Sequence, residues 1–208
     1  MSAFRKGSAL RRGRIAAGLG LAVVVGTVVG PRGAVARPEP AAMTGGWKGA
    51  WAASMQPPSP GFEPNWSQDG FAAQTVRQVV RVSVGGSRLR THLSNAYGTA
   101  PLRITGATIA RAGQAGSVQP GSLRRLTFRG RRSVVVSAAG SVASDAIWLR
   151  TRPLERLTIT MYFADPTGPA TFHSVATATS YRAAGNWLDD IGGGFTDTSH
   201  SWYYLEGR

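Results

Sequence analysis

The sequence predicts an all-β protein, an antiparallel β-sandwich of the jelly-roll-like kind, preceded by a signal peptide. Two observations carry this prediction. Short runs of Val, Ile, Leu and Thr alternate with Gly, Pro, Asn and Ser clusters from residue 47 onward. No stretch keeps its apolar residues at the 3.6-residue spacing of a helix. Many short strands separated by turns are typical of an antiparallel sandwich or barrel.

The first 36 residues have the organisation of a secretory signal peptide. Five basic residues lie between positions 5 and 14, an apolar stretch covers 15–29, and Ala34-Val35-Ala36 offers a cleavage site. The apolar stretch is shorter than the roughly 20 residues that a membrane-spanning helix needs, so no stable membrane anchor is expected. We therefore expect a secreted protein that uses the Sec route, with twin-arginine export through Arg11-Arg12 as the alternative.

Cleavage after Ala36 leaves a chain long enough for one domain with its own core. The chain has no cysteine, so neither disulfides nor thiol chemistry are expected. The signal removes six of the 24 basic residues and none of the ten acids, which lowers the net charge from +14 to +8. Because no helix-turn-helix, zinc finger or aromatic RNA-binding pattern is present, we expect no nucleic-acid partner and place most arginines on solvated strand faces.

The clearest predicted unit is a β-hairpin. Apolar residues alternate along 76–84 and again along 89–93, and Gly85-Gly86 lies between them, which predicts a tight type I′ or II′ turn. The same register places Arg81 opposite Arg90, so a carboxylate or an anionic ligand is expected nearby. The second strand then enters a turn at 95–98.

The other elements follow as a series of strands. Residues 37–46 form a Pro/Gly/Ala-rich linker and 112–122 a loop. Further strands are predicted at 102–111 (with a bulge near Gly106), 126–128, 134–136, 147–149, 157–163 and 171–181.

Two groups of residues have the composition of a hydrolase site, but neither predicts one. His92, Ser94 and Asn95 lie within four positions, yet neighbours on one strand face are too far apart and too parallel to form a nucleophile–base pair. Asp197 and His200 have D-x-x-H spacing, but the sequence contains no G-D-S and no G-x-S-x-G nucleophile motif. We therefore predict no catalytic residue, an outer strand face for His92 and Ser94, and a loop for Asp197 and His200.

No metal or cofactor is predicted either. The three histidines are far apart and no H-E-x-x-H motif occurs. A calcium site formed by Asp189, Asp190 and Asp197 is one reading, and an ordinary acidic turn is the preferred one.

Aromatic residues near turns are the candidates for substrate binding. Trp47, Trp51, Trp66 and Tyr97 could stack on sugars or on lipid-like substrates. The alternative is that these rings close the ends of the sandwich.

Several segments resemble the N-terminal region of secreted bacterial SGNH/GDSL-type hydrolases, which are esterases and lipases. The likeness rests on WKGAWAASMQPP (47–58), the run 71–111, LTFRG (126–130), SDAIWL (144–149), ERLTITMYF (155–163), TFHSVATATSY (171–181) and SWYYLEG (201–207). The resemblance implies a β-sandwich accessory domain over 47–185 and a connecting segment over 186–208 that leads to an SGNH hydrolase domain.

The family's nucleophile, oxyanion-hole and late D-x-x-H blocks have no counterpart here, and Asp197 and His200 precede the point where the catalytic domain would start. The expected function is thus an accessory domain that is inactive by itself, although its family is one of ester hydrolases. A stand-alone module that binds a glycan or a wall polymer is the alternative.

Overall fold

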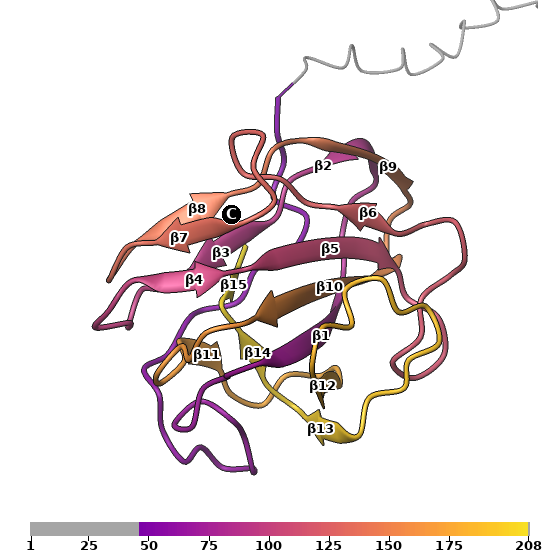
Figure 1. Cartoon of the computed structure of the whole chain (residues 1–208). Helices are drawn as coiled ribbons and strands as arrows, with labels where there is room; N and C mark the ends of the chain where they lie inside the picture. The colour runs from indigo at the N-terminus through magenta and orange to yellow at the C-terminus, as the bar shows by residue number, and fades with distance from the viewer. Residues whose placement is uncertain (1–45, 208) are drawn as a thin grey trace, which may run out of the picture. The chain divides into compact units, whose positions relative to one another are not determined.

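The computed structural model describes residues 46–207 (Figure 1). The predicted signal peptide and residues 37–45 of the predicted linker lie outside this range. The described residues form antiparallel strands joined by turns and loops, and they include no helix, hence none that could cross a membrane. The all-β prediction is therefore confirmed for this part of the chain, and the arrangement is consistent with a β-sandwich.

The strands are short and follow each other closely. They are β1 (Gln74–Arg81), β2 (Gly86–Leu89), β3 (His92–Ser94), β4 (Leu102–Ile104), β5 (Gly106–Arg111), β6 (Arg124–Arg125), β7 (Val134–Val136), β8 (Ser141–Ala143), β9 (Ile147–Thr151), β10 (Arg156–Phe163), β11 (Phe172–His173), β12 (Ser180–Ala184), β13 (Asp197–Ser199), β14 (Trp202–Tyr203) and β15 (Leu205–Glu206).

The largest sheet has six strands in the order β13-β12-β1-β10-β5-β6, and Figure 1 shows β1, β10 and β5 running side by side. β1 pairs with β10 along its whole length and with β12 on its other side. The alternation read from the sequence holds here, because Val76 and Val80 both join the main apolar core.

The smaller sheets supply the opposing side of that core. β15-β3-β8, β4-β7, β2-β9 and β11-β14 form four separate short sheets. Leu93, Leu102, Val136, Leu149 and Leu205 from these strands belong to the same buried cluster as the core face of the six-stranded sheet. Burial of these side chains between strands of different sheets stabilises the fold in the manner of a sandwich.

The other face of the six-stranded sheet is also covered, and its centre is polar. Arg77 is completely buried there and lies opposite Thr160, which in turn lies opposite Thr108. Its guanidinium donates to Thr160 Oγ1 (2.9 Å), to the Gly116 carbonyl (2.7 Å) and to the backbone and side chain of Asp190. Desolvation by burial lowers the pKa of Arg77, while the Asp190 carboxylate opposes that shift. Arg77 is thus an exception to the solvated faces expected for most arginines.

The predicted connecting segment contributes strands to the same compact unit. β13 pairs with β12, β14 with β11, and β15 with β3. Tyr203, Tyr204 and Leu205 are buried. Residues 186–207 therefore complete the β structure, and their link to a further domain stays a prediction.

The predicted Gly85-Gly86 hairpin is wrong. β1 pairs with β10 and β12, while β2 pairs with β9, so Arg81 lies opposite Arg156 and not opposite Arg90. Neither glycine has the positive φ that a type I′ or II′ turn requires. Gly85 serves a close approach instead, because an added Cβ would lie 2.6 Å from the carbonyl oxygen of Thr151.

Other predicted strands differ in their boundaries. The run 102–111 is split at Thr105 into β4 and β5, which pair with different strands, so the irregularity near Gly106 is a change of sheet. The run 171–181 is split into β11 and β12. Residues 126–128 are not in a named strand, although Phe128 and Arg131 bridge across the expected turn.

Candidate ligand-binding pocket

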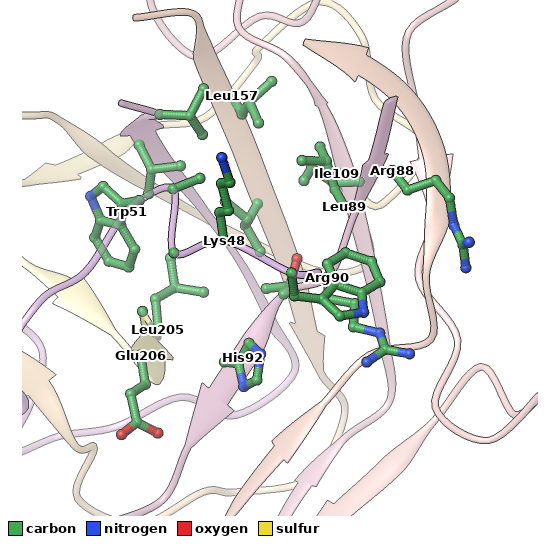
Figure 2. Close-up of a pocket in the computed structure, with 18 residues that line it drawn as sticks. Lys48, Trp51, Arg88, Leu89, Arg90, His92, Ile109, Leu157, Leu205 and Glu206 are labelled. Atoms are coloured by element: carbon green, nitrogen blue, oxygen red, sulfur yellow. The ribbon is translucent and has the colours of Figure 1, made fainter. Parts of the chain in front are cut away.

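A cavity of about 400 Å³ opens beside the N-terminal segment 47–51 (Figure 2). Its walls come from this segment, from the stretch 88–92, from β1, β5 and β10, and from the C-terminal residues 205–207. Parts of the chain that are far apart in sequence thus meet around one space. Its volume lies within the range of small-molecule sites in proteins.

The interior of the cavity is apolar. Ile109 on β5, and Leu157 and Ile159 on β10, line it together with Val80 and Val82. All five belong to the main buried core, so the cavity reaches from the surface to the core face of the six-stranded sheet. A ligand that enters it exchanges water for aliphatic side chains.

The rim of the cavity is cationic. Lys48, Arg88 and Arg90 line it and are exposed. Within residues 46–207, none of these three forms a salt bridge with a carboxylate. They are therefore available to an anionic group at the mouth.

Aromatic rings hold two of these cations in place. The guanidinium carbon of Arg90 lies 4.4 Å from the centroid of the Trp47 ring. Arg88 lies between the rings of Trp47 (5.8 Å) and Trp148 (5.7 Å). Cation–π attraction at this range restrains the guanidinium groups without neutralising their charge.

One titratable pair lies where the last strand borders the cavity. His92 on β3 is the register partner of Glu206 on β15, and both half-buried side chains line the pocket. Figure 2 shows them together, with Leu157 and Ile109 at the opposite end. His92 is therefore half-buried in the wall of the cavity, and it does not lie on a fully exposed outer face as predicted.

The structure separates the four aromatic residues predicted to bind substrate. Trp47 and Trp51 both line the cavity, and Trp51 packs edge-on against Trp202 with centroids 4.9 Å apart. Trp66 is buried in the core, where it stacks on Tyr203 at 5.4 Å. Tyr97 is exposed in the turn after β3 and does not line the cavity.

The Ser/His/Asn cluster is not arranged for nucleophilic catalysis. Ser94 is only 1% exposed, so it does not lie on an outer face as predicted, and its Oγ accepts a hydrogen bond from the backbone N–H of Ala96. Asn95 is buried, and its amide donates to backbone carbonyls that hold the turn. Across residues 46–207 no hydrogen bond joins a histidine to a serine hydroxyl. A nucleophile activated by a neighbouring base is thus not formed.

Asp197 and His200 contact different partners and not each other. Asp197 is in β13 and not in a loop, and it forms a 3.0 Å ion pair with Arg182. His200 contacts Glu63 at 3.2 Å. Neither side chain is hydrogen-bonded to the other, so the D-x-x-H spacing has no catalytic geometry.

The aspartates of the alternative calcium site point to different partners. Asp189 pairs with Arg125, Asp190 with Arg77, and Asp197 with Arg182. No group of three or more metal-ligating side chains occurs in the described part of the chain. Each carboxylate is neutralised by an arginine, which does not favour a cation there.

Sequence reasoning missed Arg88, Arg90 and Trp148 as parts of one site. Arg88 and Trp148 are register partners across β2 and β9. That pairing joins segments about sixty residues apart, and it could not be read from local alternation. The one signal in the sequence was the two-residue spacing of Arg88 and Arg90, which places both side chains on the same face of a strand.

Comparison with known proteins identifies no family for this chain. No family model matches the sequence. No curated protein matches it either. The interpretation of the pocket therefore depends on its own geometry.

Proposed function

We propose that this chain is the N-terminal accessory domain of a secreted SGNH/GDSL-type ester hydrolase. In this proposal, residues 47–207 form a jelly-roll-like β-sandwich that binds part of the substrate, and a hydrolase domain supplies the chemistry. Support comes from the motifs spread over 47–207 and from the antiparallel strands that those motifs form.

The observation that carries the proposal is the position of the last strand. Leu205, Glu206 and Gly207 line the cavity, so a domain joined after residue 208 would begin at the mouth of the pocket. A ligand held in the pocket would then lie near the junction with the catalytic domain. That position suits an accessory domain that shares a substrate with an enzyme.

The chain by itself is proposed to lack hydrolase activity. Its 208 residues contain no G-D-S block, and among residues 46–207 no serine hydroxyl is hydrogen-bonded to a histidine. The test is hydrolysis of a short p-nitrophenyl ester by the purified chain. We expect no turnover above that of buffer. Turnover that disappears in Ser94→Ala or His200→Ala would overturn this part of the proposal.

The accessory role has a separate test in the gene. Sequencing of the DNA past codon 208 is expected to reveal a hydrolase-coding region with a G-D-S block within a few tens of codons, in frame or after a frameshift. A stop codon followed by unrelated sequence would contradict the accessory role.

Secretion belongs to the same proposal and is tested by the mature N-terminus. Protein recovered from the culture medium is expected to start at Arg37, after the Ala34-Val35-Ala36 site. Full-length chain retained inside the cell would contradict it.

A stand-alone module that binds a glycan or wall polymer is the second candidate. The observation that favours it is the exposed pair Trp47 and Trp148 with Arg88 between the rings, since flat exposed rings stack on sugars. Pull-down on insoluble polysaccharides, with Trp47→Ala and Trp148→Ala as controls, tests it. No retention on any polymer would exclude this candidate.

A further inference from the structure

We infer that the cavity between the N-terminal segment and the six-stranded sheet binds the acyl chain of a fatty carboxylate, with the carboxylate at the cationic rim. The inference deepens the proposed function by naming a ligand class. It depends on the pocket alone, however, and would hold for this chain whether or not a hydrolase domain follows.

The interior selects for hydrocarbon and against sugar. Val80, Val82, Ile109, Leu157 and Ile159 offer aliphatic surface and no hydrogen-bonding side chain. A sugar in that position would leave its hydroxyl groups without partners, which costs on the order of 1–3 kcal/mol for each group. A methylene chain loses nothing there, and each methylene that leaves water gains about 0.8 kcal/mol.

The rim selects for a negative head group. Three cations, Lys48, Arg88 and Arg90, surround the mouth, while Glu206 is the one acidic residue in the lining. Hydrogen bonds from the backbone of Gly130 and from Thr127, with a smaller contribution from Arg90, lower the pKa of the Asp145 carboxyl group. Asp145 offsets part of the Arg90 charge, but it forms no ion pair with Arg90 within residues 46–207 and does not line the cavity. Lys48, Arg88 and Arg90 still outnumber Glu206 and the nearby Asp145, so an excess of positive charge remains at the mouth for a ligand.

The two parts of the lining are arranged as an amphiphile requires. The aliphatic side chains come from β5, from β10 and from the end of β1, where they belong to the buried core, whereas Arg88 and Arg90 come from the exposed stretch before β3. Trp47 and Trp51 also line the cavity and add aromatic surface to its wall. The apolar interior matches the hydrocarbon chain of a fatty carboxylate, and the cationic rim matches its carboxylate group.

Isothermal titration calorimetry of the full chain with octanoate, decanoate and dodecanoate, each below its micelle concentration, tests the inference. The dissociation constant is expected to fall about fourfold for each added methylene until the cavity is filled. Decanol is expected to bind more weakly than decanoate, and decyltrimethylammonium more weakly still. Cello-oligosaccharides serve as the sugar probe.

Two kinds of variant separate the interior from the rim. Ala50→Phe fills the cavity from a half-buried position and leaves intact the Ala50 carbonyl, which accepts bonds from Ser83. It should weaken decanoate binding at least tenfold. Leu89→Trp fills the cavity from β2 and provides the same test if Ala50→Phe does not fold. The double variant Arg88→Gln/Arg90→Gln should weaken decanoate about fivefold and leave decanol unchanged.

The matched control is Arg129→Gln/Arg131→Gln, which removes two exposed arginines that do not line the cavity. Its affinity for decanoate should equal that of the unmodified chain. Four results would each overturn the inference: no binding of any fatty acid, no dependence on chain length, equal loss in the control, or tighter binding of the oligosaccharide than of decanoate. All of these results concern ligand binding, whereas the gene-sequence and esterase tests concern a following domain and ester turnover, so the two kinds of failure are distinguishable.

Discussion

The side-chain amide of Gln78 pairs with the backbone of Tyr203 as a neighbouring strand would. Gln78 Nε2 donates to the Tyr203 carbonyl at 2.9 Å, and the Tyr203 N–H donates to Gln78 Oε1. Both residues are fully buried. One glutamine on the core face of β1 thus satisfies a backbone donor and a backbone acceptor on β14, and it anchors the C-terminal segment to the centre of the main sheet.

Replacement of Gln78 by methionine should destabilise the fold strongly. The variant keeps the side-chain length but leaves the buried N–H and C=O of Tyr203 without partners, so we expect a loss of about 2–4 kcal/mol in the free energy of unfolding. Urea denaturation followed by tryptophan fluorescence measures this loss. Gln114→Met, at an exposed position, should change stability by less than about 0.5 kcal/mol. Equal effects of the two variants would contradict the anchoring role of Gln78.

Arg77 should be essential on the opposite face of β1. Arg77→Met removes the cation that pairs with the Asp190 carboxylate and the donor to the carbonyls of Gly116 and Asp190, while the carboxylate keeps only backbone N–H donors. A loss of about 3–5 kcal/mol is therefore expected. Thermal unfolding monitored by circular dichroism measures it. The exposed pair offers a control, because Arg125→Met should cost at most about 1 kcal/mol. A similar melting temperature for both variants would show that the buried network contributes little.

Alkaline pH should unfold the protein in part through Tyr204. Burial raises the pKa of Tyr204 to about 12, above its ordinary value of 10.0. The unfolded chain therefore ionises first, and stability that is complete below pH 10 is lost as the pH rises toward 12. The loss attributable to this residue is about 2–3 kcal/mol.

The measurement is urea denaturation at pH 9, 10, 11 and 12 for the unmodified chain and for Tyr204→Phe. The variant should lose less stability over this interval, whereas Tyr97→Phe, at an exposed position, should follow the unmodified chain. Parallel curves for Tyr204→Phe and the unmodified chain would show that the buried hydroxyl is not responsible.

Replacement of Trp66 should lower the stability of the fold much more than replacement of Trp47, although both were predicted to bind substrate. Trp66→Ala removes a ring that stacks on Tyr203 in the core and should cost about 3–5 kcal/mol of stability. Trp47→Ala removes a half-exposed ring at the rim and should cost less than about 1 kcal/mol. Chemical denaturation compares the two, and a larger loss for Trp47→Ala would contradict the assignment of Trp66 to the core.

The strand content of the fold was readable from local patterns, whereas the pairing was not. Alternation correctly placed Val76 and Val80 on a core face, because the two-residue period of a strand is a local property. Gly85-Gly86 was misread as a turn, since a glycine that permits close approach and a glycine that permits positive φ look the same in a sequence.

The candidate site shows the same division. Trp47 and Trp51 were predicted to bind substrate and do line the cavity, but Trp66 has the same composition signal and lies in the core. Arg88 and Trp148 meet only because β2 pairs with β9, a contact that no local pattern predicts. Arg77 could not be distinguished from the surface arginines in the sequence, because its partners Gly116, Thr160 and Asp190 lie between about 40 and 110 residues away.

The pairing of β15 with β3 also governs when this chain can fold as it is made. Leu93 on β3 cannot pair with Leu205 until the end of the chain has been synthesised. β1 has no strand to pair with until residues 156–163 have been synthesised. A nascent chain that has reached β9 therefore holds a strand with two unpaired edges and no closed core. The fold can close only after nearly all of these residues have left the ribosome.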